Sequence, residues 1–266
     1  MGIPIYQVDA FTRRPFHGNP ATVVMLSEAK PDDWMLAVAQ EMKHSETAFL
    51  LKQEVGYNLR WFTPTNEVDL CGHATLACAH ILYETGRQKP EEIVRFSTRS
   101  GLVTARRSGT RIEMNFPTKP VEPVQPPDGL LQALGGLAPR YVGHSGEDYL
   151  LELENENLVR MLQPDLAQLK ALPLVKGVLV TATSDSSDYD FVSRFFSPVE
   201  GIDEDPVTGM AHCMLGPYWG TKLNRAAFTA YQASKRGGEV RLRVDGNRIF
   251  LSGEAMTIFT GEMRME

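Results

Sequence analysis

The sequence predicts an α+β protein of two similar, strand-rich domains, because its second half repeats the pattern of its first. GLVTARRSGTRIEM at 101–114 and GEVRLRVDGNRIFL at 238–251 lie 137 residues apart, and both run from a glycine through a strand and a tight turn into Arg-Ile and another strand. RWFTP at 60–64 returns as RFFSP at 194–198, and CGHA falls on TGMA between these pairs. Three matches in one order indicate a duplication, whereas chance recurrence of glycine-containing hairpins is the alternative.

The elements of the first half are mainly strands. Apolar runs predict strands at 3–10, 22–26, 47–51, 57–63, 93–97, 102–107 and 111–116. One helix is expected over 31–42 and a prominent one over 74–85, ended by Gly86. The stretch PTKPVEPVQPP at 117–127 holds five prolines in eleven residues, which excludes a regular helix or central strand and indicates a linker. We therefore expect domains at 1–117 and 128–266, with the extreme C-terminus able to cross back to the first.

Composition narrows the functional class. The chain has 266 residues, 42% of them apolar and 23% charged, which is ordinary for a globular protein. Its net charge of -6 argues against a broad nucleic-acid surface. Three cysteines are too few for a disulfide framework. No signal peptide, membrane-spanning stretch, dinucleotide or nucleotide fingerprint, serine-hydrolase elbow or HExxH occurs. The expectation is a cytoplasmic protein with no organic cofactor, metal, nucleic acid or membrane partner.

The repeat places a glycine at the start of a helix in each half. Gly72 and Gly209 let the backbone approach a ligand closely, and the exposed N–H groups of a helix start favour an anion. If the two halves face each other, both helix starts would reach one interdomain cleft. This arrangement predicts a site for a small anionic metabolite that carries a carboxylate.

Several motifs together resemble the PhzF, or phenazine-biosynthesis-like, family. They are GNPATVV at 18–24, SETAFL at 45–50, RWFTPTNEVDLCGHATLA at 60–77, RFFSPVEGIDEDPVTGMAH at 194–212 and GEAMTIFTGEM at 253–263. The resemblance runs through the whole chain in order. It implies the diaminopimelate epimerase fold, in which two pseudo-symmetric domains each wrap a β-barrel-like sheet around a central helix. It also implies a homodimer.

The resemblance assigns roles to individual positions. It implies that Glu46 of SETAF is the general acid/base and that His73 and Asp205 line the same cleft as further catalytic residues. Gly72, Thr208, Gly209 and Met210 fall on its substrate-binding positions. Met210 replaces a serine that is usual in the family. A hydroxyl donor is thus exchanged for an apolar thioether, which argues against the family's best-known substrate, a dihydroxylated cyclohexadiene carboxylate.

The residues themselves leave alternatives beside these roles. Glu46 enters an apolar strand, where a carboxylate is costly unless it has a partner or a task, so the alternative is that it pairs with a basic group or caps a turn. His73 could cap backbone groups, and Asp205 could cap the following helix or order His73. Cys71 is most simply a small residue at a helix start. Thr208 at the equivalent position cannot supply a second thiolate, so two-thiol racemisation is disfavoured.

The function that follows is a cofactor-independent isomerase that moves a proton on a small carboxylate-bearing metabolite. Glu46 would be its general acid/base in the interdomain cleft. The alternative is a non-catalytic ligand-binding or protein-interaction protein on the same fold, since fold does not determine function. Met210 favours the alternative, whereas Glu46, His73 and Asp205 favour the enzyme.

Overall fold

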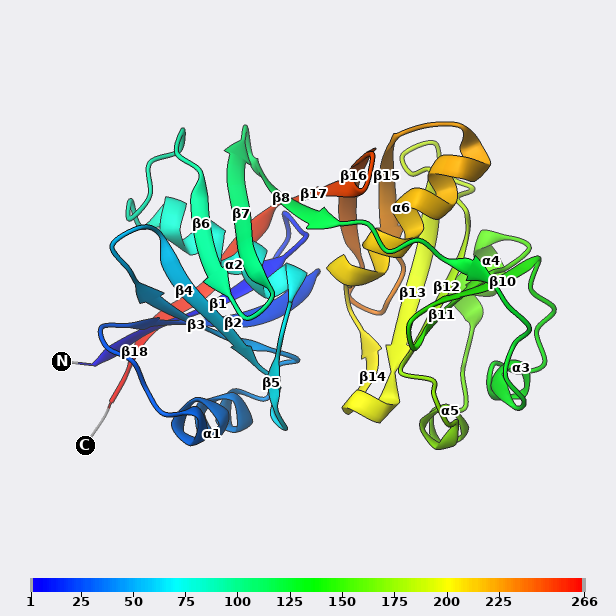
Figure 1. Cartoon of the computed structure of the whole chain (residues 1–266), viewed down its shortest axis with the longest axis horizontal. Helices are drawn as coiled ribbons and strands as arrows, with labels where there is room; N and C mark the ends of the chain where they lie inside the picture. The colour runs from blue at the N-terminus through cyan, green and yellow to red at the C-terminus, as the bar shows by residue number, and fades with distance from the viewer. Residues whose placement is uncertain (1, 265–266) are drawn as a thin grey trace. The chain divides into compact units, whose positions relative to one another are not determined.

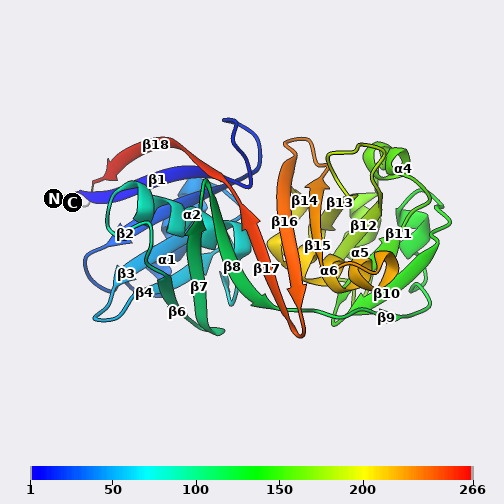
Figure 2. The same cartoon turned by 90° about the horizontal axis from the view of Figure 1, so that it is seen from above.

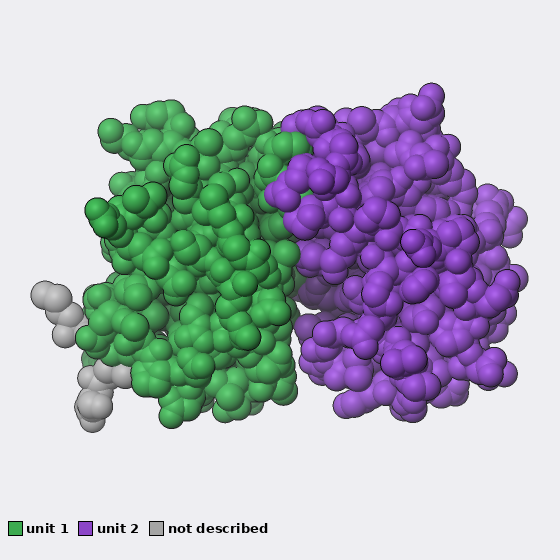
Figure 3. Space-filling model, in the orientation of Figure 1, with its two compact units in different colours: residues 1–116, 250–266 green, residues 117–249 purple. Residues whose placement is uncertain are grey.

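The computed structural model describes residues 2–264, which form two compact units (Figure 3). Unit 1 contains the residues up to 116 together with those from 250 onward, and unit 2 contains residues 117–249. The chain therefore leaves unit 1 once and returns to it once. Within residues 2–264, no helix has the length and apolar character that crossing a membrane requires.

Unit 1 is a curved sheet that contains the seven predicted strands and two further ones, β5 and β18 (Figure 1). Its strands are β1 (Ile3–Ala10), β2 (Asn19–Leu26), β3 (Thr47–Lys52), β4 (Tyr57–Phe62), β5 (Glu67–Val68), β6 (Val94–Thr98), β7 (Gly101–Ser108), β8 (Arg111–Pro117) and β18 (Ala255–Met263). Antiparallel pairs join β18 to β1, β1 to β2, β3 to β4, β6 to β7 and β7 to β8. Parallel pairs join β2 to β3 and β4 to β6.

Helix α2 (Gly72–Glu84) is the core of unit 1 (Figure 2). Every residue from 72 to 79 is buried, and the helix packs against β1, β2, β3, β7 and β18. A helix that is small and apolar on all sides can be stable only when it is covered on all sides. Helix α1 (Asp32–Met42) instead buries one face, with Met35, Val38 and Ala39, against β3 and β4.

Unit 2 repeats the same pairing scheme. Its strands are β9 (Glu122–Pro123), β10 (Tyr141–Ser145), β11 (Asp148–Glu152), β12 (Gly177–Thr183), β13 (Phe191–Ser197), β14 (Ile202–Asp205), β15 (Ala227–Gln232) and β16 (Gly238–Asp245), followed by β17 (Arg248–Gly253) on the way back to unit 1. Pairs β9–β10, β10–β11, β12–β13 and β15–β16 are antiparallel, whereas β11–β12 and β13–β15 are parallel. Each pair matches one of unit 1 in order and direction, so the predicted pseudo-symmetric fold is confirmed.

One helix of unit 2 has a counterpart at the equivalent position of the repeat in unit 1. Helix α6 (Gly209–Leu223) occupies the place of α2 and packs against β15 and β16. The short helices α3 (Leu130–Ala133), α4 (Glu156–Met161) and α5 (Leu166–Ala171), and the 3₁₀ turn η1 (Pro198–Glu200), complete the unit. The predicted linker contains one short strand, β9, which includes Pro123 and pairs with β10.

The repeat extends to a partly buried ion pair that is joined by two hydrogen bonds. In unit 1, Nε and Nη2 of Arg60 donate to the two carboxylate oxygens of Glu67 at 2.7 and 2.6 Å. In unit 2, Nε and Nη2 of Arg194 donate to Glu204 at 2.6 and 3.0 Å. The arginines are 134 residues apart and the glutamates 137, which are the offsets of the sequence repeat. Both pairs clamp the strand pair that precedes the central helix.

Gly18 turns the chain from β1 into β2, and its substitution should be costly. Its φ is +65°, and a Cβ added there would lie 2.1 Å from the carbonyl oxygen of Ala10. We expect Gly18→Ala to lower the free energy of unfolding by about 2–3 kcal/mol, because strain and a backbone clash add. Gly109 has nearly the same φ but nothing within 4 Å of the added Cβ, so Gly109→Ala should cost only ~1 kcal/mol. Urea unfolding of both variants measures the difference, and equal costs would refute the clash.

Candidate active site

Glu46 lies between the end of α1 and the start of β3. Helix α1 stops at Met42, where Lys43 takes the left-handed conformation with a φ of 55°. Three residues then lead to Thr47, the first residue of β3. The Glu46 side chain is 13% exposed, so most of it is removed from water. The predicted entry of this carboxylate into a buried strand therefore holds.

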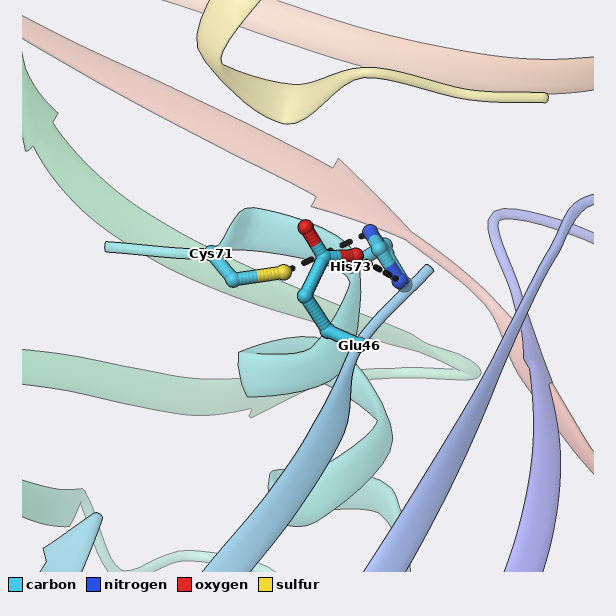
Figure 4. A group of neighbouring side chains, drawn as sticks. All are labelled: Glu46, Cys71 and His73. Atoms are coloured by element: carbon cyan, nitrogen blue, oxygen red, sulfur yellow. Dashed lines mark hydrogen bonds and ion pairs between the residues drawn. The ribbon is translucent and has the colours of Figure 1, made fainter. Parts of the chain in front are cut away.

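His73 meets Glu46 from the first turn of α2 (Figure 4). Its ring is 4% exposed, and its Nε2 lies 3.3 Å from Oε2 of Glu46. Gly72 begins the helix and Cys71 stands before it in an extended conformation. Unit 1 thus brings together three of the predicted site residues, Glu46, Gly72 and His73. The His73 imidazole is one partner that the structure gives Glu46.

Further polar groups surround the His73 ring. Nδ2 of Asn19 lies 3.1 Å from Nδ1, and Sγ of Cys71 lies 3.5 Å from the same nitrogen. Oγ of Ser45 lies 3.4 Å from Nε2. Asn19 and Ser45 were not predicted as site residues, although both stand in segments that carry the family resemblance. Their side chains meet His73 only because β2 and β3 run beside α2.

The environment keeps His73 neutral. Burial lowers the pKa of its imidazole from an ordinary value of 6.5 to about 3, and the nearby charge of His44 acts in the same direction. The ring also stands at a helix start, where the helix dipole disfavours a cation. His73 is therefore a neutral hydrogen-bonding group at physiological pH. It can donate from one ring nitrogen and accept at the other.

Glu46, Cys71 and His73 also offer one donor atom each within 4.8 Å of one another. Carboxylate, thiolate and imidazole are donor types that a zinc ion accepts. The chemistry proposed below uses these groups as proton-transferring and hydrogen-bonding groups and requires no metal.

The other predicted residues gather at the start of α6 in unit 2. Asp205 ends β14 and is buried, Thr208 precedes the helix, and Gly209 and Met210 form its first turn. The Thr208 hydroxyl donates to Oδ2 of Asp205 at 2.5 Å. Gln232, which the sequence did not single out, accepts from the Thr208 N–H at 2.8 Å and donates to the Asp205 carbonyl at 2.7 Å. These bonds hold the helix start in a fixed conformation.

His212 gives unit 2 a measurable response to acid. It is fully buried, its Nδ1–H donates to the Thr208 carbonyl at 2.8 Å, and burial lowers its pKa to about 4. The unfolded chain takes up this proton below pH 6.5, whereas the folded protein does so only near pH 4, so stability falls as pH falls through this window. In the repeat, Thr75 makes the equivalent bond from its hydroxyl to the Cys71 carbonyl.

We therefore expect His212→Thr to lessen the acid sensitivity of the protein. The loss of unfolding free energy between pH 7 and pH 5 should shrink by about 2 kcal/mol, because one depressed histidine contributes roughly 1.4 kcal/mol per pH unit. Urea unfolding at both pH values gives this quantity. His17→Thr, at an exposed histidine, is the control and should leave the difference unchanged. An unaltered difference in His212→Thr would contradict the assignment.

Known proteins share both the sequence and the fold. The profile of the phenazine biosynthesis-like proteins matches residues 8–261. An uncharacterized isomerase of Halalkalibacterium halodurans is 49% identical over 264 residues, which cover 99% of each chain. The human phenazine biosynthesis-like domain-containing protein is 35% identical, again over 99% of each chain. A crystal structure of a PhzF family protein from Enterococcus faecalis superposes with a TM-score of 0.94, at 41% identity and with all of both chains covered.

A more distant neighbour supports the fold alone. A probable proline racemase from Agrobacterium radiobacter, solved with bound carbonate, gives a TM-score of 0.65 at 12% identity and covers 99% of this chain and 93% of its own. The names of the closer relatives support an isomerase-type role. On the whole-chain match to the profile and on relatives well above 30% identity, this chain belongs to the phenazine biosynthesis-like, or PhzF, family.

Proposed function

We propose that the chain is a cofactor-independent isomerase that moves a proton on a small carboxylate-bearing metabolite, with Glu46 as its general acid/base. One observation carries the proposal: a largely buried carboxylate lies 3.3 Å from a neutral imidazole at the start of the central helix. A base placed in this way is partly removed from water and has an imidazole within 3.3 Å. Enzymes use such settings to bring the pKa of a carboxyl group toward the working pH.

The proposed reaction needs a single proton carrier. The Glu46 carboxylate removes a proton from a carbon of the substrate, and the electron pair left behind delocalises toward the neighbouring unsaturated group. The resulting carboxylic acid then returns the proton to another atom of the substrate or to the other face of the same carbon. The enzyme ends unchanged, and neither an oxidant nor a reductant takes part. Double-bond migration and epimerisation are the two outcomes of this scheme.

The remaining site residues would bind the substrate. The backbone N–H groups that follow Gly72 and Gly209 suit an anion at a helix start. Thr208 and Met210 would contact the substrate, and His73 and Asp205 would assist the proton transfer. Met210 offers an apolar surface where a hydroxyl is usual, so the preferred substrate should present an apolar group there. We further propose a cytoplasmic homodimer; light scattering that gives about 30 kDa at micromolar concentration would reject the dimer.

Met210 also favours the second candidate function, a protein that binds a small carboxylate without converting it. Incubation with a panel of small carboxylates in D₂O separates the two. An isomerase that transfers a proton through Glu46 incorporates deuterium from solvent into one member of the panel, and NMR or mass spectrometry detects it. A binding protein shifts the signals of its ligand but incorporates no deuterium, and that result would overturn the enzymatic proposal.

A further inference from the structure

The amide of Asn19 determines which ring nitrogen of His73 carries the proton. Asn19 is fully buried, and its Nδ2 lies 3.1 Å from Nδ1 of the imidazole. An amide NH₂ group can only donate, so Nδ1 must accept this bond through its lone pair. In a neutral imidazole the single ring proton then resides on Nε2.

The other ring nitrogen faces the proposed base. Nε2 lies 3.3 Å from Oε2 of Glu46 and 3.4 Å from Oγ of Ser45. A proton on Nε2 is attracted to this carboxylate oxygen, whereas a lone pair on Nε2 would face the lone pairs of that oxygen. We infer that Asn19 is a positioning residue that holds His73 in the Nε2–H tautomer and thereby directs its only N–H toward Glu46.

The choice between tautomers matters because His73 is neutral. An imidazolium would donate from both nitrogens, and the identity of its neighbours would not decide where a proton lies. The buried ring at the start of α2 has one proton to place, and its two sides differ in kind. One side meets an amide donor and the weakly polar thiol of Cys71, and the other meets a carboxylate and a hydroxyl. A proton on Nε2 makes the contacts with Asn19 and with Glu46 both attractive, whereas a proton on Nδ1 makes both repulsive.

The fold keeps the Asn19 amide in place. Asn19 is the first residue of β2 and pairs with Ala10 of β1. Gly18, before it, approaches the Ala10 carbonyl so closely that no side chain fits. The strand itself packs against α2, which carries His73. The donor and the ring therefore stand on two packed elements, which is how a positioning residue gains accuracy.

The catalytic consequence rests on the proposed function, whereas the tautomer does not. An N–H of His73 that faces the carboxylate favours the charged form of Glu46. The opposite tautomer would turn an acceptor toward the same oxygen and disfavour the charged base. Asn19, which is neutral, would in this way act on the base through His73.

The tautomer can be read directly by NMR of the full-length protein labelled with ¹⁵N at its six histidines. Long-range ¹H–¹⁵N correlation spectra distinguish a protonated from an unprotonated ring nitrogen, and the signals lost in His73→Gln identify His73. We expect the wild-type ring to be protonated at Nε2 alone. A ring protonated at Nδ1 would overturn the inference, and this measurement needs no variant at Asn19.

Asn19→Asp then reverses the chemistry without changing the shape. Its carboxylate can only accept, so Nδ1 of His73 should gain a proton; a spectrum that still shows protonation at Nε2 alone would also overturn the inference. Thr22→Val is the matched control, because Thr22 lies on the same strand and its hydroxyl contacts Nδ1 of His44 at 2.8 Å. It should alter the His44 signals and leave those of His73. An Nε2–H tautomer together with an active Glu46→Gln protein would reject the proposed base but retain the role of Asn19.

Discussion

Glu46→Gln is expected to lower turnover, or the rate of solvent-proton exchange into substrate, by roughly 10²–10⁴-fold, which is the usual contribution of a general acid or base. Glutamine keeps the length and an acceptor oxygen for the N–H of His73, but it cannot take up the substrate proton. Ligand binding should therefore change little, and the loss should fall on kcat. Deuterium incorporation in D₂O measures the rate, and isothermal titration with the same ligand measures the affinity.

The control for this substitution is Glu41→Gln. Glu41 lies on the exposed side of α1, five residues before Glu46, and its change removes the same charge from the same region. It should leave the rate within a factor of two or so of wild type, since surface changes away from a site have small effects. Wild-type exchange in Glu46→Gln, together with its loss in His73→Ala or Cys71→Ala, would show that the base is elsewhere.

Arg194→Met is expected to produce the largest loss of stability, about 3–5 kcal/mol, because it removes one partner of a buried ion pair. The Arg194 side chain is 9% exposed, and besides Glu204 its Nη1 donates to the carbonyl of Leu162 at 2.7 Å and to that of Val159 at 3.2 Å. These carbonyls belong to the end of α4, where a helix has no internal donors left. The methionine would leave both the Glu204 carboxylate and these carbonyl groups without the donor that Arg194 supplies.

Arg60→Met is the matched comparison, since the repeat supplies the same bidentate pair in unit 1. The Arg60 side chain is 24% exposed, its other carboxylate partner is the exposed Asp32, and Glu67 keeps a second cation, Nη1 of Arg99 at 3.0 Å. Its loss should cost only ~1 kcal/mol. Urea unfolding followed by circular dichroism compares the two variants. Equal costs would mean that the hydrogen bonds from Arg194 to backbone carbonyl groups add no stability beyond that of the ion pair.

The sequence predicted what depends on local pattern and on the repeat. Seven strands of unit 1 and both helices there were expected within a few residues, because apolar runs and glycines mark them, whereas β5 and β18 were not expected as strands. The central helix begins at Gly72 rather than at 74. Gly72 and His73 are buried in its first turn, but the apolar pattern used for the prediction starts after them. Glu46 and His73 were both named from their motifs, and the structure brings them together in unit 1.

The sequence could not predict which side chains contact one another in the folded protein. Asn19 stands in a quoted motif, yet only the packing of β2 against α2 shows that it reaches a ring 54 residues further along the chain. Gln232 carries no motif, and its bonds to Thr208 and Asp205 depend on where β15 ends beside the start of α6. The short helices between 130 and 171 lack a strong apolar period, so tertiary contacts, rather than local preference, define them.

The return of the chain to unit 1 has a consequence for how the protein is made. Strand β1, which is synthesised before the other strands of both units, lies between β2 and β18, and Ile3 pairs with Met263 while Ala10 pairs with Ala255. Unit 2 is complete in sequence once residue 249 has been added, but unit 1 still lacks its last strand at that moment. The half whose synthesis starts first is therefore the half that finishes folding last, and until then one edge of β1 is exposed to any strand that can pair with it.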